Sequence, residues 1–155
     1  MKLPNGLVRG RDGLIYVPST LTGIIDVFSI TEKRLLEKIT SIHVGLPIDN
    51  LSIDKNGDIY AAAFPQAYKW THSSKDPSIN PPSAVFRIGK AGKGYQGESR
   101  KGSMERYEGD YIIEKAVEDD GSFLPGSTTV VHDAQTGRLF LAGVMAPFIM
   151  ICQKG

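Results

Sequence analysis

Short apolar runs separated by glycine, proline, asparagine and aspartate recur along the whole chain. The runs are rich in Ile, Val, Tyr and Phe, which is typical of β-strands bounded by turns. Only 31–39 resembles a helix, and its short length between strands favours a turn followed by a strand. The pattern predicts an all-β fold with no substantial helix. The predicted strands are 7–9, 14–18, 24–29, 34–39, 47–53, 59–64, 84–88, 111–118, 128–132, 138–144 and 148–152.

Glycine turns arrange these strands into a repeat. Gly13 and Gly57 each follow an Asp or Asn and are 44 positions apart, and Gly137 ends a third similar turn 80 positions later. The segment 89–110, dense in Gly, Lys, Arg, Ser and Glu, accounts for the longer second spacing. A period of about 40–45 residues with four short strands is typical of a propeller blade.

The repeat predicts one partial β-propeller domain over 1–155. Its blades are expected at roughly 1–45, 46–88 and 111–155, with a flexible insertion over 89–110. Propellers typically have four to eight blades, so three blades do not close a ring. Their open edges and faces would need a cover, which is either a second copy of the chain or a missing N-terminal half.

Composition and charge narrow the classes of partner. With 155 residues, 41% hydrophobic and 23% charged, the chain is expected to be one globular domain. The net charge of +1 gives no argument for nucleic acid or an anionic membrane. No apolar run approaches the ~18 residues of a transmembrane segment. The start at Met1 leaves no room for a signal peptide, and the compartment stays open.

Several motifs of other site classes are incomplete. The segment 54–58 begins like an EF-hand loop, but Ile59 and Pro65 stand where that loop requires Gly and Glu. In the glycine-rich segment 89–95, Tyr95 stands where a phosphate loop carries Lys and then Ser or Thr. No Gly-x-Ser-x-Gly segment supports a serine hydrolase. The histidines are too widely spaced for a local metal motif: His43, His72 and His132.

Oxygen-bearing side chains precede the apolar strands at the same place in two repeats. Asn5 precedes the first strand, and Asp49 with Asn50 stands at the corresponding place 44 positions later. Such a repeat suggests a ring of oxygens around an axis, which suits a hard cation. Asparagine also caps turns and tolerates unusual backbone angles, so a purely structural role for Asn5 and Asn50 remains an alternative.

A family resemblance follows from blocks that run in order across almost the whole chain. They are Pro-Asn-Gly at 4–6, Asp-Asn-Leu-Ser-Ile-Asp at 49–54, Gly-Asp-Ile-Tyr at 57–60, the Asn-Pro-Pro-Ser segment within 80–88, Gly-Ser-Thr at 126–128, 139–144 and 151–152. In these blocks the chain resembles the C-terminal half of the paraoxonase/arylesterase family. That family is related to the gluconolactonase-like and strictosidine synthase-like six-bladed propellers. The resemblance implies about three four-stranded blades of a six-bladed ring.

The resemblance also implies a calcium ion on the propeller axis and the hydrolysis of lactones and aryl esters. Asn5, Asp49 and Asn50 match three side-chain ligands of that calcium. Thr128 and Val144 match walls of the substrate pocket. A cation at this place would polarise the carbonyl of a small ester or lactone and stabilise the developing oxyanion.

The chain departs from the family pattern in ways that bear on activity. The other ligands of the family, and its water-activating histidines, belong to the first half of its fold. Phe64, expected at the pocket, replaces a histidine that many members carry, so no catalytic residue is assigned. Cys152 resembles a C-terminal cysteine that vertebrate members pair with an N-terminal one, and it is the single cysteine here.

Two functions are therefore expected from the sequence. The first is a calcium-dependent ester or lactone hydrolase that is incomplete as a catalyst alone. The alternative is a non-catalytic propeller remnant or interaction module that dimerises through its open blade edges.

Overall fold

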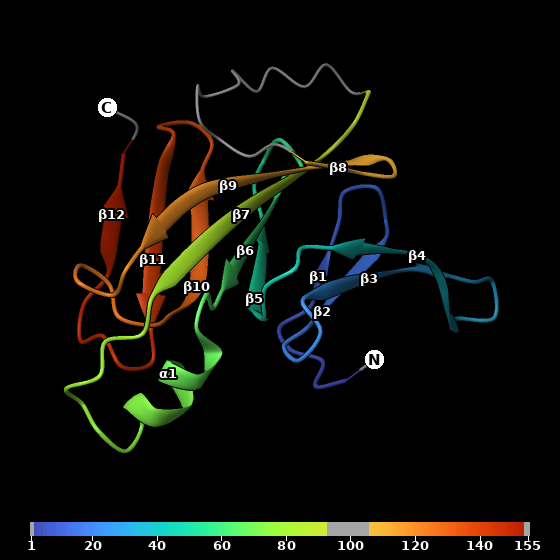
Figure 1. Ribbon diagram of the computed structural model, residues 1–155. Helices are drawn as coiled ribbons and strands as arrows, with labels where there is room; N and C mark the ends of the chain where they lie inside the picture. The colour runs from blue at the N-terminus through green and yellow to red at the C-terminus, as the bar shows by residue number, and fades with distance from the viewer. Residues whose placement is uncertain (1, 93–105, 154–155) are drawn as a thin grey trace.

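The computed structural model of the chain describes residues 2–92 and 106–153. These residues form three antiparallel sheets that follow one another across the molecule, with a single short helix at one end (Figure 1). In this part of the chain, no helix is long and apolar enough to cross a membrane. The prediction of an all-β fold made of partial propeller blades is confirmed.

The first sheet is a four-stranded meander with the strands in chain order. It contains β1 (Val8–Arg9), β2 (Ile15–Ser19), β3 (Ile24–Ile30) and β4 (Leu36–His43). The turn between β2 and β3 contains Gly23 with a φ of +64°, a backbone conformation that glycine adopts without strain. The segment 31–39 contains a turn and the start of a strand, as predicted, rather than a helix.

The second sheet has five strands in the order β5-β6-β7-β9-β8, and the third sheet has three in the order β10-β11-β12. Helix α1 (Ala67–Ser73) lies between β6 and β7. The strands of these sheets are β5 (Ile48–Ile53), β6 (Ile59–Ala63), β7 (Ser83–Lys90), β8 (Arg106–Glu108), β9 (Tyr111–Asp119), β10 (Ser127–Asp133), β11 (Arg138–Gly143) and β12 (Met150–Cys152).

The boundaries of the second blade differ from those expected from the sequence. The segment Tyr111–Asp119, placed in a third blade over 111–155, pairs along its length with β7 in the second sheet. β7 is buried along almost its whole length, so its second edge needs a strand to satisfy the backbone. The expected insertion at 89–110 contains the end of β7 and all of β8, and its central residues 93–105 lie outside the described part of the chain.

The second sheet is the centre of the molecule because both of its faces are covered. Ala61 and Ala63 face the first sheet within one apolar cluster, in which Tyr16 and Ile25 of the first sheet take part. Ala62 lies in a separate cluster formed with the third sheet. The small side chains of β6 let the neighbouring sheets approach closely on both sides. Among the described residues, the first and third sheets each have one face covered in this way.

An ion pair and a hydrogen bond, both made by Asp12, lie between the first and second sheets at the end opposite α1. The Asp12 carboxylate accepts a hydrogen bond from the Tyr16 hydroxyl at 2.7 Å and pairs with Lys90 Nζ at 2.6 Å. Burial favours a higher pKa for Asp12, but the hydrogen bonds from Lys90, Tyr16 and the Leu14 N–H outweigh it and lower the pKa below 3.8. The same pair raises the pKa of Lys90 above 10.5, against the effect of its burial.

These pKa directions predict how the stability of the wild-type chain depends on pH. The stability that Asp12 contributes to the folded chain is fully present above its unfolded pKa of about 3.9. It is lost as the pH falls through the lower folded pKa of Asp12. The contribution of Lys90 is complete below about pH 10.4 and is lost as the pH rises through its higher folded pKa. Stability from this pair is therefore greatest between these limits.

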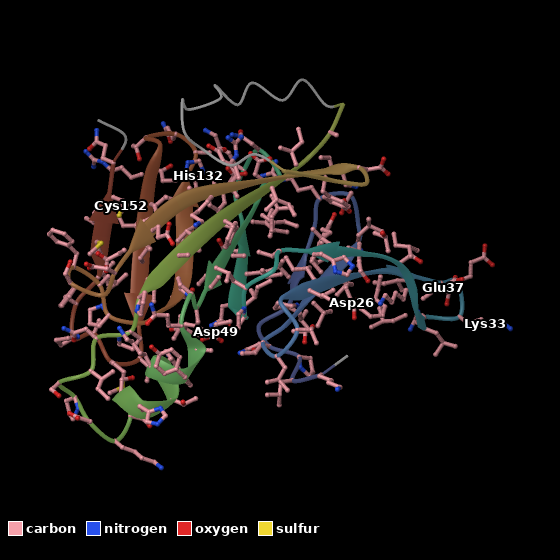
Figure 2. The ribbon with its side chains drawn as sticks, in the orientation of Figure 1. Asp26, Lys33, Glu37, Asp49, His132 and Cys152 are labelled. Carbon is pink, nitrogen blue, oxygen red and sulfur yellow. The ribbon has the colours of Figure 1, made fainter. Side chains whose placement is uncertain are left out.

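A comparison of Lys90→Met with the wild type measures this contribution. The melting temperature should fall less steeply between about pH 5 and about pH 2 in the variant, because the pKa of Asp12 returns toward its unfolded value. Lys33→Met is the matched control, since Lys33 is an exposed lysine at the far tip of the β3–β4 hairpin (Figure 2). Parallel acid profiles for Lys90→Met and the wild type would contradict the prediction.

Candidate functional site

Asn5 and Asp49, which are 44 positions apart, are in direct contact in the structure. The Asn5 side-chain amide donates a hydrogen bond to Asp49 Oδ1 at 2.5 Å, and Asn5 Oδ1 accepts one from the Gly6 N–H at 2.9 Å. The Asn5 N–H donates to the Pro18 carbonyl at 3.1 Å, which fixes this segment to the end of β2. Asn5 is exposed, so the contact is open to solvent.

A β-bulge positions Asp49 and its neighbour Asn50. Ile48 pairs with Ala63 and Leu51 with Ala61, so β5 carries one more residue than β6 over this stretch. In a regular strand adjacent side chains point to opposite faces, and a bulge changes that direction locally. The bulge falls at Asp49 and Asn50, so their side chains depart from the strict alternation of a regular strand.

Asn50 connects this pair to the third sheet. Its side-chain amide donates a hydrogen bond to the Thr128 carbonyl at 2.8 Å. Thr128 lies in a second bulge, because Ser127 pairs with Gly143 and Thr129 with Ala142. Asn50 Oδ1 lies against Gly6, where an added Cβ would stand only 2.1 Å from that oxygen. Glycine at position 6 therefore makes room for the Asn50 side chain beside Asn5.

Among the described residues, the Asp49 carboxylate has no ion pair. Burial raises the pKa of Asp49 above 3.8, and the hydrogen bond from Asn5 offsets part of that effect. A partly buried carboxylate of this kind gains stability from a bound cation.

The three predicted ligands therefore lie together, and their chemistry fits calcium. One carboxylate and two amide groups provide hard oxygen ligands, which calcium prefers. Asn5 Oδ1 and Asn50 Oδ1 both lie next to Gly6. No group of three or more His, Cys, Asp or Glu residues that could hold a metal ion occurs among the described residues.

The predicted pocket residues have different surroundings. Thr128 is buried, and its carbonyl accepts the hydrogen bond from Asn50. Phe64 is also buried, directly after β6, with its ring centroid 5.2 Å from that of Trp70 on α1. Val144 follows β11 and is 75% exposed. A role of any of the three in binding substrate stays a prediction.

Two residues that contact predicted site residues, Thr20 beside Asn5 and Trp70 beside Phe64, carried no signal in the pattern of strands. The Thr20 hydroxyl accepts a hydrogen bond from the Asn5 amide at 3.2 Å and donates one to the Ile48 carbonyl at 2.9 Å. Trp70 has a buried indole N–H without a hydrogen-bond partner in the described structure. Thr20 lies in a turn and Trp70 in the unpredicted helix α1, so no strand periodicity pointed to either. Gly6 could have been found from the Pro-Asn-Gly block.

A second polar contact joins the second and third sheets at the end opposite the Asp49 site. His132 Nδ1 lies 2.8 Å from Asp54 Oδ2, and the Asp54 side chain is fully buried. The His132 ring stacks on Tyr60 with centroids 4.5 Å apart. Figure 2 shows Asp49 and His132 at opposite ends of the sheets. This pair is separated from the candidate ligands by the length of β5 and is a structural contact between sheets.

Comparison with known proteins identifies the family of the chain. No curated protein matches the chain detectably. The family model described as Arylesterase matches residues 1–96, well over half of the chain. This match includes Asn5, Asp49 and Asn50, and it ends before Thr128 and Val144. The chain therefore belongs to the arylesterase family.

Proposed function

We propose that the site at Asn5, Asp49 and Asn50 binds calcium and serves the hydrolysis of esters or lactones. Membership in the arylesterase family supports an ester hydrolase-like function. The observation that carries the proposal is the Asp49 carboxylate, which lies against the Asn5 amide without a cationic partner in the described structure. Asn50, from the same bulge, adds a second amide.

The side chains have separate tasks at this site. Asp49 supplies the negative charge that binds the cation, and the two amides add neutral oxygens. One carboxylate leaves the site with a net positive charge when calcium is bound, which favours polarisation of a carbonyl over tight structural binding. Calcium supplies Lewis-acid stabilisation of the oxyanion that forms on an ester carbonyl. Thr128, held next to Asn50, limits the space for the substrate on the side of the third sheet.

The site of one chain is expected to be incomplete. Calcium takes about 6–8 oxygen ligands, and the three side chains supply at most half of them. None of the predicted site residues is a histidine that could activate water. We therefore expect weak calcium binding and little turnover by a single chain.

Calorimetric titration of calcium into the chain tests the ligand assignment. The expected Kd is about 0.1–1 mM, the range of weak sites that supply few charges. Asp49→Ala should weaken binding at least about tenfold, because it removes the only carboxylate of the set. Glu37→Ala is the control, since Glu37 is an exposed carboxylate on β4 (Figure 2). Undetectable binding to the wild type at ~10 mM calcium would contradict the proposal.

Hydrolysis of phenyl acetate and of a simple lactone, with and without calcium, tests the reaction. Slow calcium-dependent turnover that is lost on chelation and in Asn50→Ala would support it. Turnover that is insensitive to chelation and to Asn50→Ala would refute a calcium-dependent reaction at this site. Rapid turnover lost in Asn50→Ala would support the reaction but show that one chain carries a complete site.

A second candidate function is an interaction module, and one observation favours it. Val131, Phe140 and Ile151 pair directly across β10, β11 and β12, and neither apolar cluster of the described core includes them. An apolar sheet face of this kind is typical of a surface that another chain covers. Light scattering separates the cases: a monomer that binds calcium supports the hydrolase site alone, whereas an oligomer without calcium binding supports the interaction module.

A further inference from the structure

The outer face of the third sheet has an apolar row at its centre that the described residues leave uncovered. Val131 pairs with Phe140, and Phe140 with Ile151, so their side chains form one row across three strands. Val131 is 53% and Ile151 58% exposed. The alternate residues of the same strands, such as Val130 and Leu141, are buried against the second sheet. One face of this sheet therefore packs in the core, while the other has an apolar centre that nothing in the described structure covers.

The first sheet has an equivalent face at the other end of the molecule. Tyr16 and Val27 pack toward the second sheet, whereas their strand neighbours Ile15 and Phe28 pair on the opposite face. Ile15 and Phe28 are partly exposed and lie outside both core clusters of the described residues. The second sheet lies between the first and the third, so these two uncovered faces point away from each other (Figure 1).

The buried carboxylate on the outer face of the first sheet already has partners. The carboxylate on that face belongs to Asp26, whose residue is already buried. Asp26 Oδ1 pairs with Lys38 Nζ at 2.7 Å and accepts a hydrogen bond from the Ser41 hydroxyl at 2.8 Å. Burying an unpaired charge would oppose association, but a carboxylate with both an ion pair and a hydrogen bond tolerates burial.

One chain cannot bring its own two open faces together, but two copies can cover both. The outer face of the third sheet in each copy would pack on the outer face of the first sheet in the other copy. This arrangement has two equal contacts related by a two-fold axis, the commonest symmetry of protein dimers. It places six sheets around one axis, within the range of closed propellers.

The incomplete ligand set points to the same arrangement. One chain supplies three oxygen-bearing side chains, whereas calcium takes about 6–8 ligands. Asn5 lies just before β1, and Asp49 with Asn50 lies on β5 beside β10. These three strands are the first of their sheets and would surround the axis of a six-sheet ring. A second copy would bring another carboxylate and two more amides to that axis.

We propose that the chain forms a two-fold dimer in which both copies contribute Asn5, Asp49 and Asn50 to one shared calcium ion. The inference rests on the proposed function, because it needs these residues to be calcium ligands. Calcium that binds the dimer better than the monomer stabilises the dimer by mass action. Dimerisation should therefore depend on calcium, and calcium binding on the protein concentration.

Two measurements on the wild-type chain test this proposal directly. Calorimetry should give a stoichiometry of about 0.5 calcium per chain, as a shared site requires. Light scattering should show twice the monomer mass in excess calcium and a larger monomer fraction after chelation. One calcium per chain on a monomer would overturn the inference and leave the proposed function standing. A dimer that binds no calcium would refute both the shared site and the calcium ligands.

Charge substitutions locate the interface. Val131→Glu places a carboxylate in the apolar row of the third sheet and should give a monomer with calcium binding weakened at least about tenfold. Leu35→Glu is the matched control, since Leu35 is 64% exposed in the turn between β3 and β4, outside the strands of both faces. Its dimer and calcium affinity should equal those of the wild type.

A calcium-binding dimer unaffected by Val131→Glu would show that another surface associates, which overturns the interface. Because a glutamate on a strand could also perturb folding, Val131→Thr provides a second variant with nearly the same shape. It should retain the wild-type circular dichroism spectrum and melting temperature while shifting the dimerisation constant toward the monomer. A folded Val131→Thr variant with wild-type dimerisation would count against a contact at this residue.

Discussion

Gly23→Ala is expected to destabilise the chain by about 2–5 kcal/mol, the sum of left-handed strain and overpacking. Gly23 has a φ of +64°, and an added Cβ would lie 2.7 Å from the Leu46 carbonyl oxygen and 2.9 Å from the backbone nitrogen of the same residue. The Gly23 carbonyl also accepts hydrogen bonds from the Val44 and Gly45 N–H groups, at 2.9 and 3.1 Å. Because the contacts are to backbone, a rotamer change cannot relieve them.

Gly57→Ala separates the two causes of this effect. Gly57 has a φ of +88°, and nothing lies within 4 Å of an added Cβ. Alanine there should cost only the backbone strain, about 1–2 kcal/mol. Urea denaturation of both variants gives the comparison. Equal losses at the two positions would mean that the close approach of Leu46 to Gly23 does not limit stability.

His132→Leu is expected to cost about 3–5 kcal/mol, as when one partner of a buried pair is removed. Asp54 Oδ1 accepts hydrogen bonds from the Asn56 and Asp58 N–H groups, whereas Oδ2 has the His132 contact at 2.8 Å. Leucine would retain apolar volume against Tyr60 but would leave Oδ2 without a partner in a fully buried side chain. The free energy of unfolding from urea denaturation is the measurement.

His72→Leu is the matched control, because His72 is exposed on α1 and its Nδ1 contacts Thr71 and the Tyr68 carbonyl of the same helix. A double-mutant cycle of His132→Leu with Asp54→Asn isolates the energy of the pair. Additive losses in the cycle would contradict direct coupling between the two side chains. Calcium affinity should be unchanged in His132→Leu, since His132 and Asp49 lie at opposite ends of the sheets (Figure 2).

Local patterns in the sequence were enough to predict most strands and the turns between them. The strands show as alternating apolar residues, and the turns that bound them lie at Gly13, Gly57 and Gly137. Both signals depend only on side-chain direction and backbone conformation over a few consecutive residues. Two elements escaped this reasoning. Helix α1 is seven residues long without a side-chain N-cap, and the three residues of β8 are too few to show a period.

The assignment of β9 to the second sheet depended on tertiary structure. Its sequence predicts a strand but not a neighbour, because its backbone can pair equally well with any open edge. β7 provides that edge, since it is buried and already paired with β6 on its other side. The long segment between Gly57 and Gly137 was attributed to an insertion alone. It also contains β8, the fifth strand of the second sheet.

The candidate ligands were also predictable only in part from the sequence, and their contacts depended on tertiary structure. The types and repeat positions of Asn5, Asp49 and Asn50 could be read from the sequence, because an oxygen ligand needs a particular residue at a particular place in each repeat. Their contact depends on the bulge in β5 and on the space left by Gly6, and the Thr128 carbonyl reaches Asn50 across 78 positions. Contacts between sheets are made by residues far apart in the chain, and no local period encodes which of them meet. The folded structure therefore decided that Asp49 contacts Asn5 and that Asn50 lies against the neighbouring Gly6.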